Sequence, residues 1–316
     1  MTVIQLPCPT DFTADMQDLI LQSADTVSFT LLQSGNLVLS ERFSPAEGTI
    51  RISGLGRVVE TCLYGQLKNE GSQDFLSADF DFRIDDVSVC LKTLFPSHYR
   101  ISGLAASPQV LSHGSSDVCH PGITHPLTFR TEATANLYAA GTLIGSVSVG
   151  SVGGTPVTVD GDPAQLFPDT YSLATHIVYN CGGLNFTSWI DHRPYQESLT
   201  FRFLNVYDCP ETLLLRRPVT SKPQTTDATA IVYGQEQRYS IVPGDEYTAQ
   251  VGELAHTSEY QHWRDLMLAR RAEVFADGRW WPVVILKPNY TQRLGHADYK
   301  EVEFSFRMAR QGDILM

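Results

Sequence analysis

The sequence has few charged residues, and it lacks long apolar runs and basic clusters. Charged residues make up 18% of the 316 residues, whereas about a quarter is usual. No segment approaches about eighteen consecutive apolar residues, the length that a membrane-spanning helix requires. The formal net charge of −12 argues against binding to nucleic acids, which takes a basic stripe, and against binding to anionic lipids.

The cysteine pattern argues against a disulfide scaffold. No two cysteines form a C-x-x-C pair. Residues 1–9 lack a basic n-region, and Pro7 and Pro9 interrupt their short apolar run, so we expect no secretory signal. For a chain of this size without an export signal we predict free, buried thiols. The cysteines are Cys8, Cys62, Cys90, Cys119, Cys181 and Cys209.

Strand patterns dominate what the sequence does contain. Hydrophobic residues, at 42%, supply enough apolar surface for substantial cores. Apolar residues alternate over Val27–Leu31 and Phe80–Ile84, with turn residues between the runs, which predicts an immunoglobulin-like β-sandwich over residues 1–103. Arg57–Leu63 is expected to be a further strand of this module.

The next two segments differ in composition. Glycine, serine, proline and histidine crowd residues 104–127 without periodicity, which predicts a linker or long loop. Residues 128–197 again contain alternating runs and are expected to form a second β-rich module.

The last segment, residues 198–316, carries the one convincing helix pattern. Ser258 and Gln261 match a capping box, and Tyr260, Trp263 and Met267 follow at the spacing of one buried helical stripe. Arg270 and Arg271 would then lie in the last helical turn, which suits the helix dipole. We therefore predict a helix over residues 258–271.

Strand patterns follow this helix in the sequence. Asp277-Gly278 favours a type I′ hairpin turn, and every second residue from Val302 to Met308 is apolar, as in a half-buried strand. Pro218–Thr226 is expected to be a loop. The predicted fold is therefore mainly β, ending in an α+β domain. The candidates for its core or interfaces are Trp263, Met267, Trp280, Trp281, Phe304 and Phe306.

Residue types that can bind metal ions cluster in the expected linker. His113, Asp117, Cys119, His120 and His125 include the ligand types that zinc prefers. Cys119 and His120 are adjacent, so they point in different directions in an extended chain. This spacing favours a plain loop, and no metal or other cofactor is expected.

Other catalytic patterns are incomplete. Asp79 and Asp81 lie on the polar face of an alternating strand, and Asp85-Asp86 falls at an expected turn, so a solvated face is favoured over a calcium site or a glycosidase pair. Residues 113–117 merely bring His, Ser and Asp into one loop, and Gly54-x-Gly56 lacks the rest of a phosphate-binding motif. We predict no catalytic residues.

Two stretches together resemble a known class of protein. Residues 189–194, WIDHRP, precede residues 201–215, FRFLNVYDCPETLLL. The C-terminal part contains the pieces W-x-x-L, D-G-x-W-x-P-V-x-I and E-x-E-F-x-F-R. These resemble minor tail or baseplate proteins encoded by prophages and related phages of Bacteroidetes. The N-terminal run VSFTLLQSGNLVLSERFSPAEGTIRISGLGRVV is similar to the small β-sandwich that opens such chains. The C-terminal pattern is also similar to the tail-tube module, a β-sandwich or barrel with one flanking helix.

This resemblance implies a non-enzymatic structural protein that associates with itself and with other tail or baseplate proteins. It implies assembly in the cytoplasm of the bacterial host, then a place in the virion tail. Neither a specific nucleic acid nor a membrane is an expected partner. The alternative is a β-sandwich that binds carbohydrates or a host surface through Trp189. An enzyme of unrecognised type is the third hypothesis.

Overall fold

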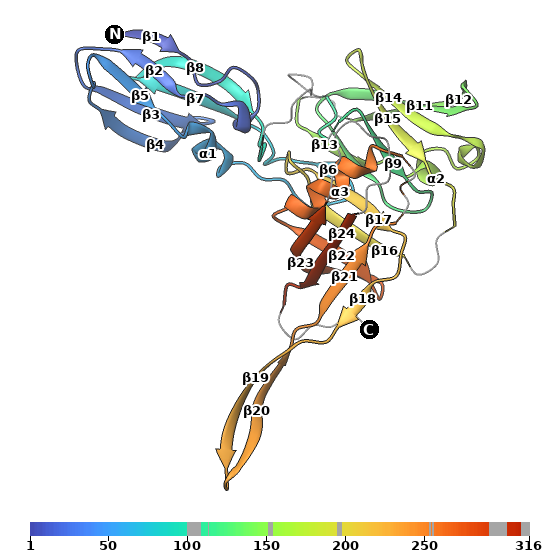
Figure 1. Ribbon diagram of the computed structural model, residues 1–316. Coiled ribbons are helices and arrows are strands. Elements are labelled where there is room, and N and C mark those ends of the chain that lie inside the picture. The colour runs from blue at the N-terminus through green and yellow to red at the C-terminus, as the bar shows by residue number, and fades with distance from the viewer. Residues whose placement is uncertain are drawn as a thin grey trace.

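A computed structural model describes residues 1–99, 109–112, 114–150, 154–194, 198–252, 254, 256–290 and 302–310. Strands dominate these residues and helices are few and short, so the prediction of a mainly β fold is confirmed. Three lobes are visible in Figure 1: a first lobe within residues 1–99, a second within 109–194 and a third within 198–310.

The first lobe is a sandwich of two sheets around one hydrophobic core. The alternation expected at Val27–Leu31 and Phe80–Ile84 is confirmed, because every second side chain there is buried. These side chains pack with those of the other sheet in a shared core. One sheet has the order β1 (Thr2–Gln5), β2 (Leu19–Gln22), β5 (Thr49–Ile52), and the other β4 (Asn36–Phe43), β3 (Val27–Gln33), β7 (Ala78–Ile84), β8 (Val87–Leu94).

The prediction of a strand at Arg57–Leu63 is wrong, because helix α1 (Leu55–Glu60) overlaps this segment. Gly54, at φ 75°, turns the chain into the helix through a left-handed conformation that glycine adopts without strain. Leu55 and Val59 are then buried four residues apart on one helical face. The single-turn helix η1 (Thr13–Asp15) lies beside α1.

The second lobe is built on a five-stranded and a three-stranded sheet. The larger sheet has the order β12 (Thr142–Gly150), β11 (Glu132–Ala139), β14 (His176–Cys181), β15 (Leu184–Ile190), β9 (Ser116–Cys119). The smaller has the order β10 (Pro126–Phe129), β13 (Val157–Asp160), β6 (Gly71–Ser72). The short helices α2 (Pro163–Leu166) and η2 (Tyr171–Leu173) complete the lobe. Strand β6 belongs to an excursion from the first third of the chain, so the two lobes share a sheet.

Part of the expected linker at residues 104–127 is in fact strand. Strand β9 pairs in parallel with β15, and three of its four residues are buried. Pro126 and Leu127 open β10, which is buried along its whole length. Composition predicted a loop because glycine, serine and histidine rarely fill a buried strand. Here paired polar groups replace the usual apolar residues.

The third lobe is a seven-stranded sheet covered by one helix. The predicted helix, hairpin and last strand are present as α3 (Glu259–Leu268), β22 (Ala272–Ala276) with β23 (Arg279–Tyr290), and β24 (Val302–Met308). Apolar side chains from each of these elements pack in one core. The strand order is β17 (Pro210–Leu215), β16 (Leu199–Leu204), β22 (Ala272–Ala276), β23 (Arg279–Tyr290), β24 (Val302–Met308), β21 (Glu246–Gln250), β18 (Thr220–Lys222). This is the coarse α+β arrangement expected for residues 198–316.

The predicted capping box at Ser258 is wrong. The Ser258 side chain makes no capping hydrogen bond, and its hydroxyl instead lies 2.8 Å from Nδ1 of His256. The helix ends at Leu268, so Arg270 and Arg271 lie beyond it. In contrast, Asp277 and Gly278 have φ angles of 51° and 73°, which agrees with the predicted type I′ turn.

One hairpin extends beyond the lobes. Strands β19 (Thr225–Val232) and β20 (Gln235–Pro243) pair only with each other in a separate two-stranded sheet. This hairpin, which we call the arm, extends away from all three lobes (Figure 1). The loop predicted at Pro218–Thr226 is therefore only partly correct, because β18 and the start of β19 lie inside it.

The three lobes meet around a small apolar cluster, which we call the junction core. The first lobe supplies Phe12 and Phe95, with Leu76 from the excursion, the second supplies Leu111, and the third supplies Val206, Tyr207 and Cys209. The Phe12 and Tyr207 rings lie 5.1 Å apart. Arg130 of the second lobe lies over the Phe95 ring at 4.1 Å and pairs with Asp11 at 3.0 Å. Apolar, cation–π and ionic contacts therefore all join the lobes.

Candidate functional site

A buried ion pair lies beside the junction core. His262 is on α3, and its Nδ1 lies 2.8 Å from Oε2 of Glu211 on β17. Its Nε2 donates to the main-chain carbonyl of Ser116 on β9 at 3.2 Å. Ser112 Oγ and Asn205 Nδ2 both donate to Oε1 of Glu211 at 2.7 Å. The pair therefore joins the second lobe to the third.

Both members of this pair are held in their charged forms. Burial alone would lower the pKa of His262, but the charge and hydrogen bond of Glu211 raise it from 6.5 to about 10. Burial would raise the pKa of Glu211, but His262 and the two donors lower it from 4.5 to about 2. Because each side chain is already bound on both sides, this arrangement favours a structural tie over proton transfer.

The residues of metal-binding type in the expected linker are only partly brought together. Asp117 Oδ2 lies 2.9 Å from Nε2 of His125, and the carboxylate raises the pKa of this histidine against the lowering effect of burial. Cys119 instead donates its thiol to the Trp189 carbonyl at 3.6 Å. Burial lowers the pKa of His120 to about 4, with Arg216 adding to the effect. His113 lies outside the described residues, and among those described no group of three or more His, Cys, Asp or Glu side chains could hold a metal ion.

The acidic residues of the first lobe bind neighbouring polar groups. Asp79 accepts a hydrogen bond from Thr93, and Asp81 accepts bonds from Arg83 and Ser88. Asp85 accepts from the main-chain N–H of Ser28 at 2.8 Å. Asp85 and Asp86 have φ angles of 47° and 64° and form the β7–β8 turn. A polar strand face and a turn account for this cluster.

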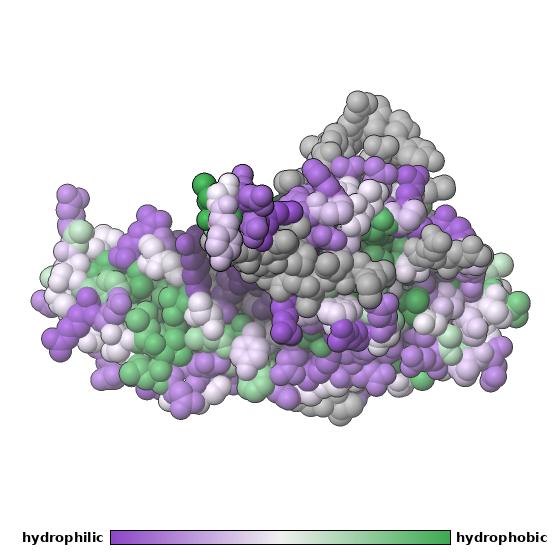
Figure 2. Space-filling view, turned by 90° about the horizontal axis from the view of Figure 1, so that it is seen from below, coloured by the Kyte–Doolittle hydropathy of each residue, from purple (hydrophilic) through white to green (hydrophobic). Residues whose placement is uncertain are grey.

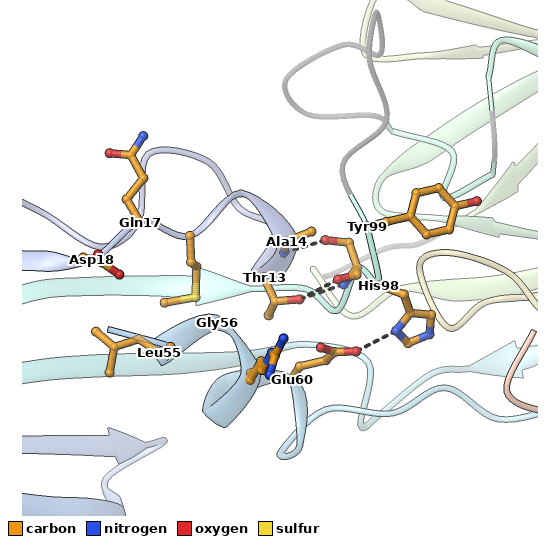
Figure 3. A pocket seen from close by; sticks show the side chains of 13 residues that line it. Thr13, Ala14, Gln17, Asp18, Leu55, Gly56, Glu60, His98 and Tyr99 are labelled. Carbon is orange, nitrogen blue, oxygen red and sulfur yellow. Dashed lines mark hydrogen bonds and ion pairs between the residues drawn. The ribbon is translucent and has the colours of Figure 1, made fainter. Parts of the chain in front are cut away.

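Gly54 and Gly56 lie at the start of α1, beside a cavity. A Cβ atom added to Gly56 would meet the Thr13 carbonyl oxygen at 2.5 Å, so this glycine permits close packing of α1 on η1. The cavity, of about 280 Å³, lies between these two elements and residues 97–99 (Figure 3). Glu60 and His98 both line it, and Figure 3 shows them directed toward each other, with His98 Nδ1 2.6 Å from Glu60 Oε1.

The polar groups of this cavity also tie the lobes together. Nε2 of His98 lies 2.7 Å from Oδ1 of Asp208 in the third lobe, and Arg270 of that lobe lies 2.7 Å from Glu60. Burial lowers the pKa of His98, but hydrogen bonds and charge from Asp208 and Glu60 raise it by more. A charged imidazole between two carboxylates stabilises the contact between the lobes.

Trp189, the candidate for glycan binding, lies in a stack of rings. Its indole is 5.0 Å from the His176 ring and 5.0 Å from the His256 ring, and the latter is stacked at 21°. His176 in turn stacks on Tyr138 at 5.2 Å. Since His256 comes from the third lobe and covers an indole face, the stack resembles a seam between lobes more than an open platform for a sugar.

A second cavity, of about 360 Å³, lies beside Trp189. Val118, Ile190 and Leu254 supply apolar walls. Asp191 and Arg193, also in its lining, form a bidentate ion pair with each other at 2.8 and 2.9 Å. Arg216 also contacts Asp191 at 3.1 Å. The charged groups beside this cavity are thus engaged with one another.

The remaining predicted residues lie in or beside the third-lobe core. Trp263, Phe304 and Phe306 are fully buried, and Met267 packs against them half-buried. Trp281 also packs on this core and has Arg279 over its ring at 3.5 Å, whereas Trp280 has Arg202 over its ring at 4.4 Å. Five of the six candidates therefore belong to this core or pack against it, whereas Trp280 contacts Arg202.

The tip of the arm is the most exposed apolar feature of the described chain. The side chains of Ile231 and Tyr233 are 78% and 102% exposed, and Val232 between them is also exposed. Tyr233 and Gly234, at φ 52° and 78°, form the turn. None of the four hydrophobic clusters of the described residues includes an arm residue. The sequence predicts strands at Ala230–Tyr233 and Arg238–Val242, but it does not reveal that they leave the lobe.

No protein-family model matches this sequence, and a search of curated proteins gave no match either. In the part of the chain that the structure describes, no helix has the length and apolar character to span a bilayer.

Proposed function

We propose that this protein is a non-enzymatic structural subunit that assembles with copies of itself and with other proteins, as minor tail or baseplate proteins of phages do. The arm is the observation that carries this proposal. A two-stranded hairpin without a core is at best marginally stable in water. Contact with a neighbouring subunit would supply the apolar surface that the arm lacks within its own chain.

The surface of the arm supports a docking function. Ile231, Val232 and Tyr233 place apolar side chains at the end farthest from the lobes (Figure 1). Exposed apolar groups at one site commonly mark a protein interface. Tyr233 is especially suited, because tyrosine contributes a large contact area and a polar hydroxyl to an interface.

The first lobe offers a second surface of this kind. Hydrophobic side chains gather on the face of this lobe shown in Figure 2. The exposed apolar side chains of the lobe include Leu37, Val87 and Leu91. Leu37 lies on β4 and the other two on β8, the two edge strands of the four-stranded sheet. Strand edges readily pair with another chain.

The interior of the molecule agrees with a structural role. The buried charged residues between the lobes, such as His262 with Glu211 and His98 with Glu60 and Asp208, bind one another. The net charge of −12 would keep unassembled copies soluble. In this proposal the chain assembles in the host cytoplasm and then resides in the virion tail. His256 against Trp189 gives the carbohydrate-binding alternative less support.

The test is the oligomeric state of the wild type and of an arm variant. In the variant, Ile231→Ser and Val232→Ser remove the apolar tip, and Tyr233→Asn keeps a residue that tolerates the positive φ. We expect sedimentation velocity and native mass spectrometry to detect oligomers of the wild type as concentration rises. The variant should remain monomeric over at least a tenfold wider concentration range, with an unchanged melting temperature because the replaced side chains are exposed.

Leu173→Ser is the matched control, because Leu173 is 74% exposed and lies in the second lobe, not in the arm. This control should associate as the wild type does. A wild type that stays monomeric at every concentration would contradict self-association. Equal loss of association in the control would show that general hydrophobicity, and not the arm, drives it.

A further inference from the structure

Strand β12 forms an open edge of the second lobe. Within the described part of the chain, the main chain of β12 pairs only with β11, so its other side has no neighbouring strand there. Figure 1 shows β12 at the outer limit of the lobe, far from the arm of its own chain. One row of N–H and C=O groups of β12 therefore faces outward, and such a row is a template for pairing with another chain.

The sequence of this edge lacks the residues that usually prevent strand pairing. None of residues 133–159 is charged, and β12 contains no proline. The edge strands of the four-stranded sheet in the first lobe, in contrast, carry charges: β4 contains Glu41 and Arg42, and β8 contains Lys92. The register with β11 shifts once near the start of β12, and Gly145–Gly150 is regular. An uncharged, regular edge of this kind favours a partner strand.

The side chains of this edge are only partly covered. Ile144, Val147 and Val149 pack against the core of the second lobe but are only half-buried. Leu143, which lies opposite Tyr138 in the register with β11, is 51% exposed. A strand added at this edge would cover the open sides of these apolar side chains, and such contacts between neighbouring strands stabilise a sheet.

The arm contains a strand that matches this edge. Among the described strands, β19 pairs only with β20, and residues 228–232 of β19 are uncharged. This segment ends in the exposed side chains of Ile231 and Val232. Strand β20 is a poorer match, because it contains Glu236 and Arg238. Two copies of this chain each carry a net charge of −12, so a contact through uncharged strands avoids placing like charges opposite each other.

We propose that the outer edge of β12 binds residues 228–232 of the arm of a second copy of this chain. This inference rests on the proposed assembly function and names the surface that receives the arm. The five-stranded sheet and the two-stranded arm would then form one continuous sheet. The arm gains the additional strands that a hairpin needs for stability in water. Because the arm and the receiving edge are different surfaces, the contact runs head to tail and leads to a ring or a filament.

The first experiment mixes two variants that each lack one side of the contact. Val147→Lys places an ammonium group that water can reach at an open edge but that an added strand would bury. The arm variant, with Ile231→Ser, Val232→Ser and Tyr233→Asn, lacks the apolar tip. Each variant alone should be monomeric in sedimentation velocity at concentrations where the wild type is oligomeric. An equimolar mixture should form a dimer with one copy of each, because one variant retains the β12 edge and the other retains the arm.

Ser172→Lys is the matched control, because it adds the same charge at an exposed position of the second lobe outside β12. This control should associate as the wild type does. Oligomers of Val147→Lys alone, or a mixture of the two variants that stays monomeric, would overturn the inference and leave the proposed assembly through the arm in place. A wild type that stays monomeric would instead contradict the proposed function, and this inference with it.

The second experiment does not depend on the folding of Val147→Lys. Main-chain hydrogen exchange of the wild type is followed by mass spectrometry at low and high protein concentration. Peptides that cover residues 142–150 and 228–232 should both exchange at least about tenfold more slowly in the oligomer, because their outward N–H groups become hydrogen-bonded. In the arm variant both segments should exchange as in the monomer. Protection of 142–150 that persists in the arm variant, or protection of the arm without 142–150, would overturn the pairing of β12 with the arm.

Discussion

Trp263 connects helix α3 of the third lobe to its sheet. Its indole lies 6.5 Å from the Phe201 ring and 5.9 Å from the Phe304 ring, and it has no exposed surface. Trp263→Ala would leave a cavity between α3 and the sheet, at a cost to the free energy of unfolding of about 3–5 kcal/mol. Urea denaturation of the wild type and variant would measure this difference.

Leu268→Ala is the matched control for Trp263→Ala. Leu268 is the last residue of the same helix, but its side chain is 52% exposed. Its truncation should change the free energy of unfolding by about 0.5 kcal/mol or less. Similar losses in the two variants would contradict the argument that burial determines the cost.

At the scale of elements, a single glycine controls the β22–β23 turn. Gly278 has φ 73°, and no atom lies within 4 Å of the position that its Cβ would take. Gly278→Ala therefore introduces backbone strain without a clash, and we expect a loss of about 1 kcal/mol. Gly244→Ala is the matched control, because Gly244 also has open space around it but no positive φ. Denaturation curves that shift equally for both variants would contradict the strain argument.

Local patterns predict the elements of this fold better than they predict the ends of the elements. Alternation at Phe80–Ile84 and Val302–Met308 was sufficient, because a period of two fixes the buried face. The prediction of the capping box was wrong because neighbouring side chains at the start of α3 have other partners. The Glu259 carboxylate is buried and pairs with Arg216 at 3.0 Å, while Ser258 binds His256. No sequence window that contains only the helix includes Arg216.

The seams between lobes were the least predictable part of the whole molecule. Strand β6 leaves the first lobe to pair with β13, and the junction core takes side chains from all three lobes. No local sequence pattern predicts either contact, because the partners are far apart in sequence. The ion pair of Asp117 and His125 was missed for another reason: both lie in one stretch whose composition favoured a plain loop, and composition does not show that their side chains meet in the interior.

The His262–Glu211 pair should make the stability of the whole molecule depend on pH. The folded pKa of His262, about 10, exceeds the ordinary value of 6.5, so its contribution is complete below pH 6.5 and is lost as pH rises through 10. The folded pKa of Glu211, about 2, lies below 4.5, so its contribution is complete above pH 4.5 and is lost as pH falls through 2. The pair therefore stabilises the fold most between pH 4.5 and 6.5.

Melting temperatures measured across pH would test this linkage. The wild type should lose stability steadily between pH 6.5 and 10. His262→Gln should destabilise the protein by about 3–5 kcal/mol at pH 6, because Glu211 is left buried without its charged partner. Its melting temperature should also change less than that of the wild type between pH 6.5 and 10. If the melting temperature of the variant falls with pH as steeply as that of the wild type, other groups control the loss of stability at alkaline pH. The His262–Glu211 pair would then not be an ion pair of a charged imidazole and a carboxylate.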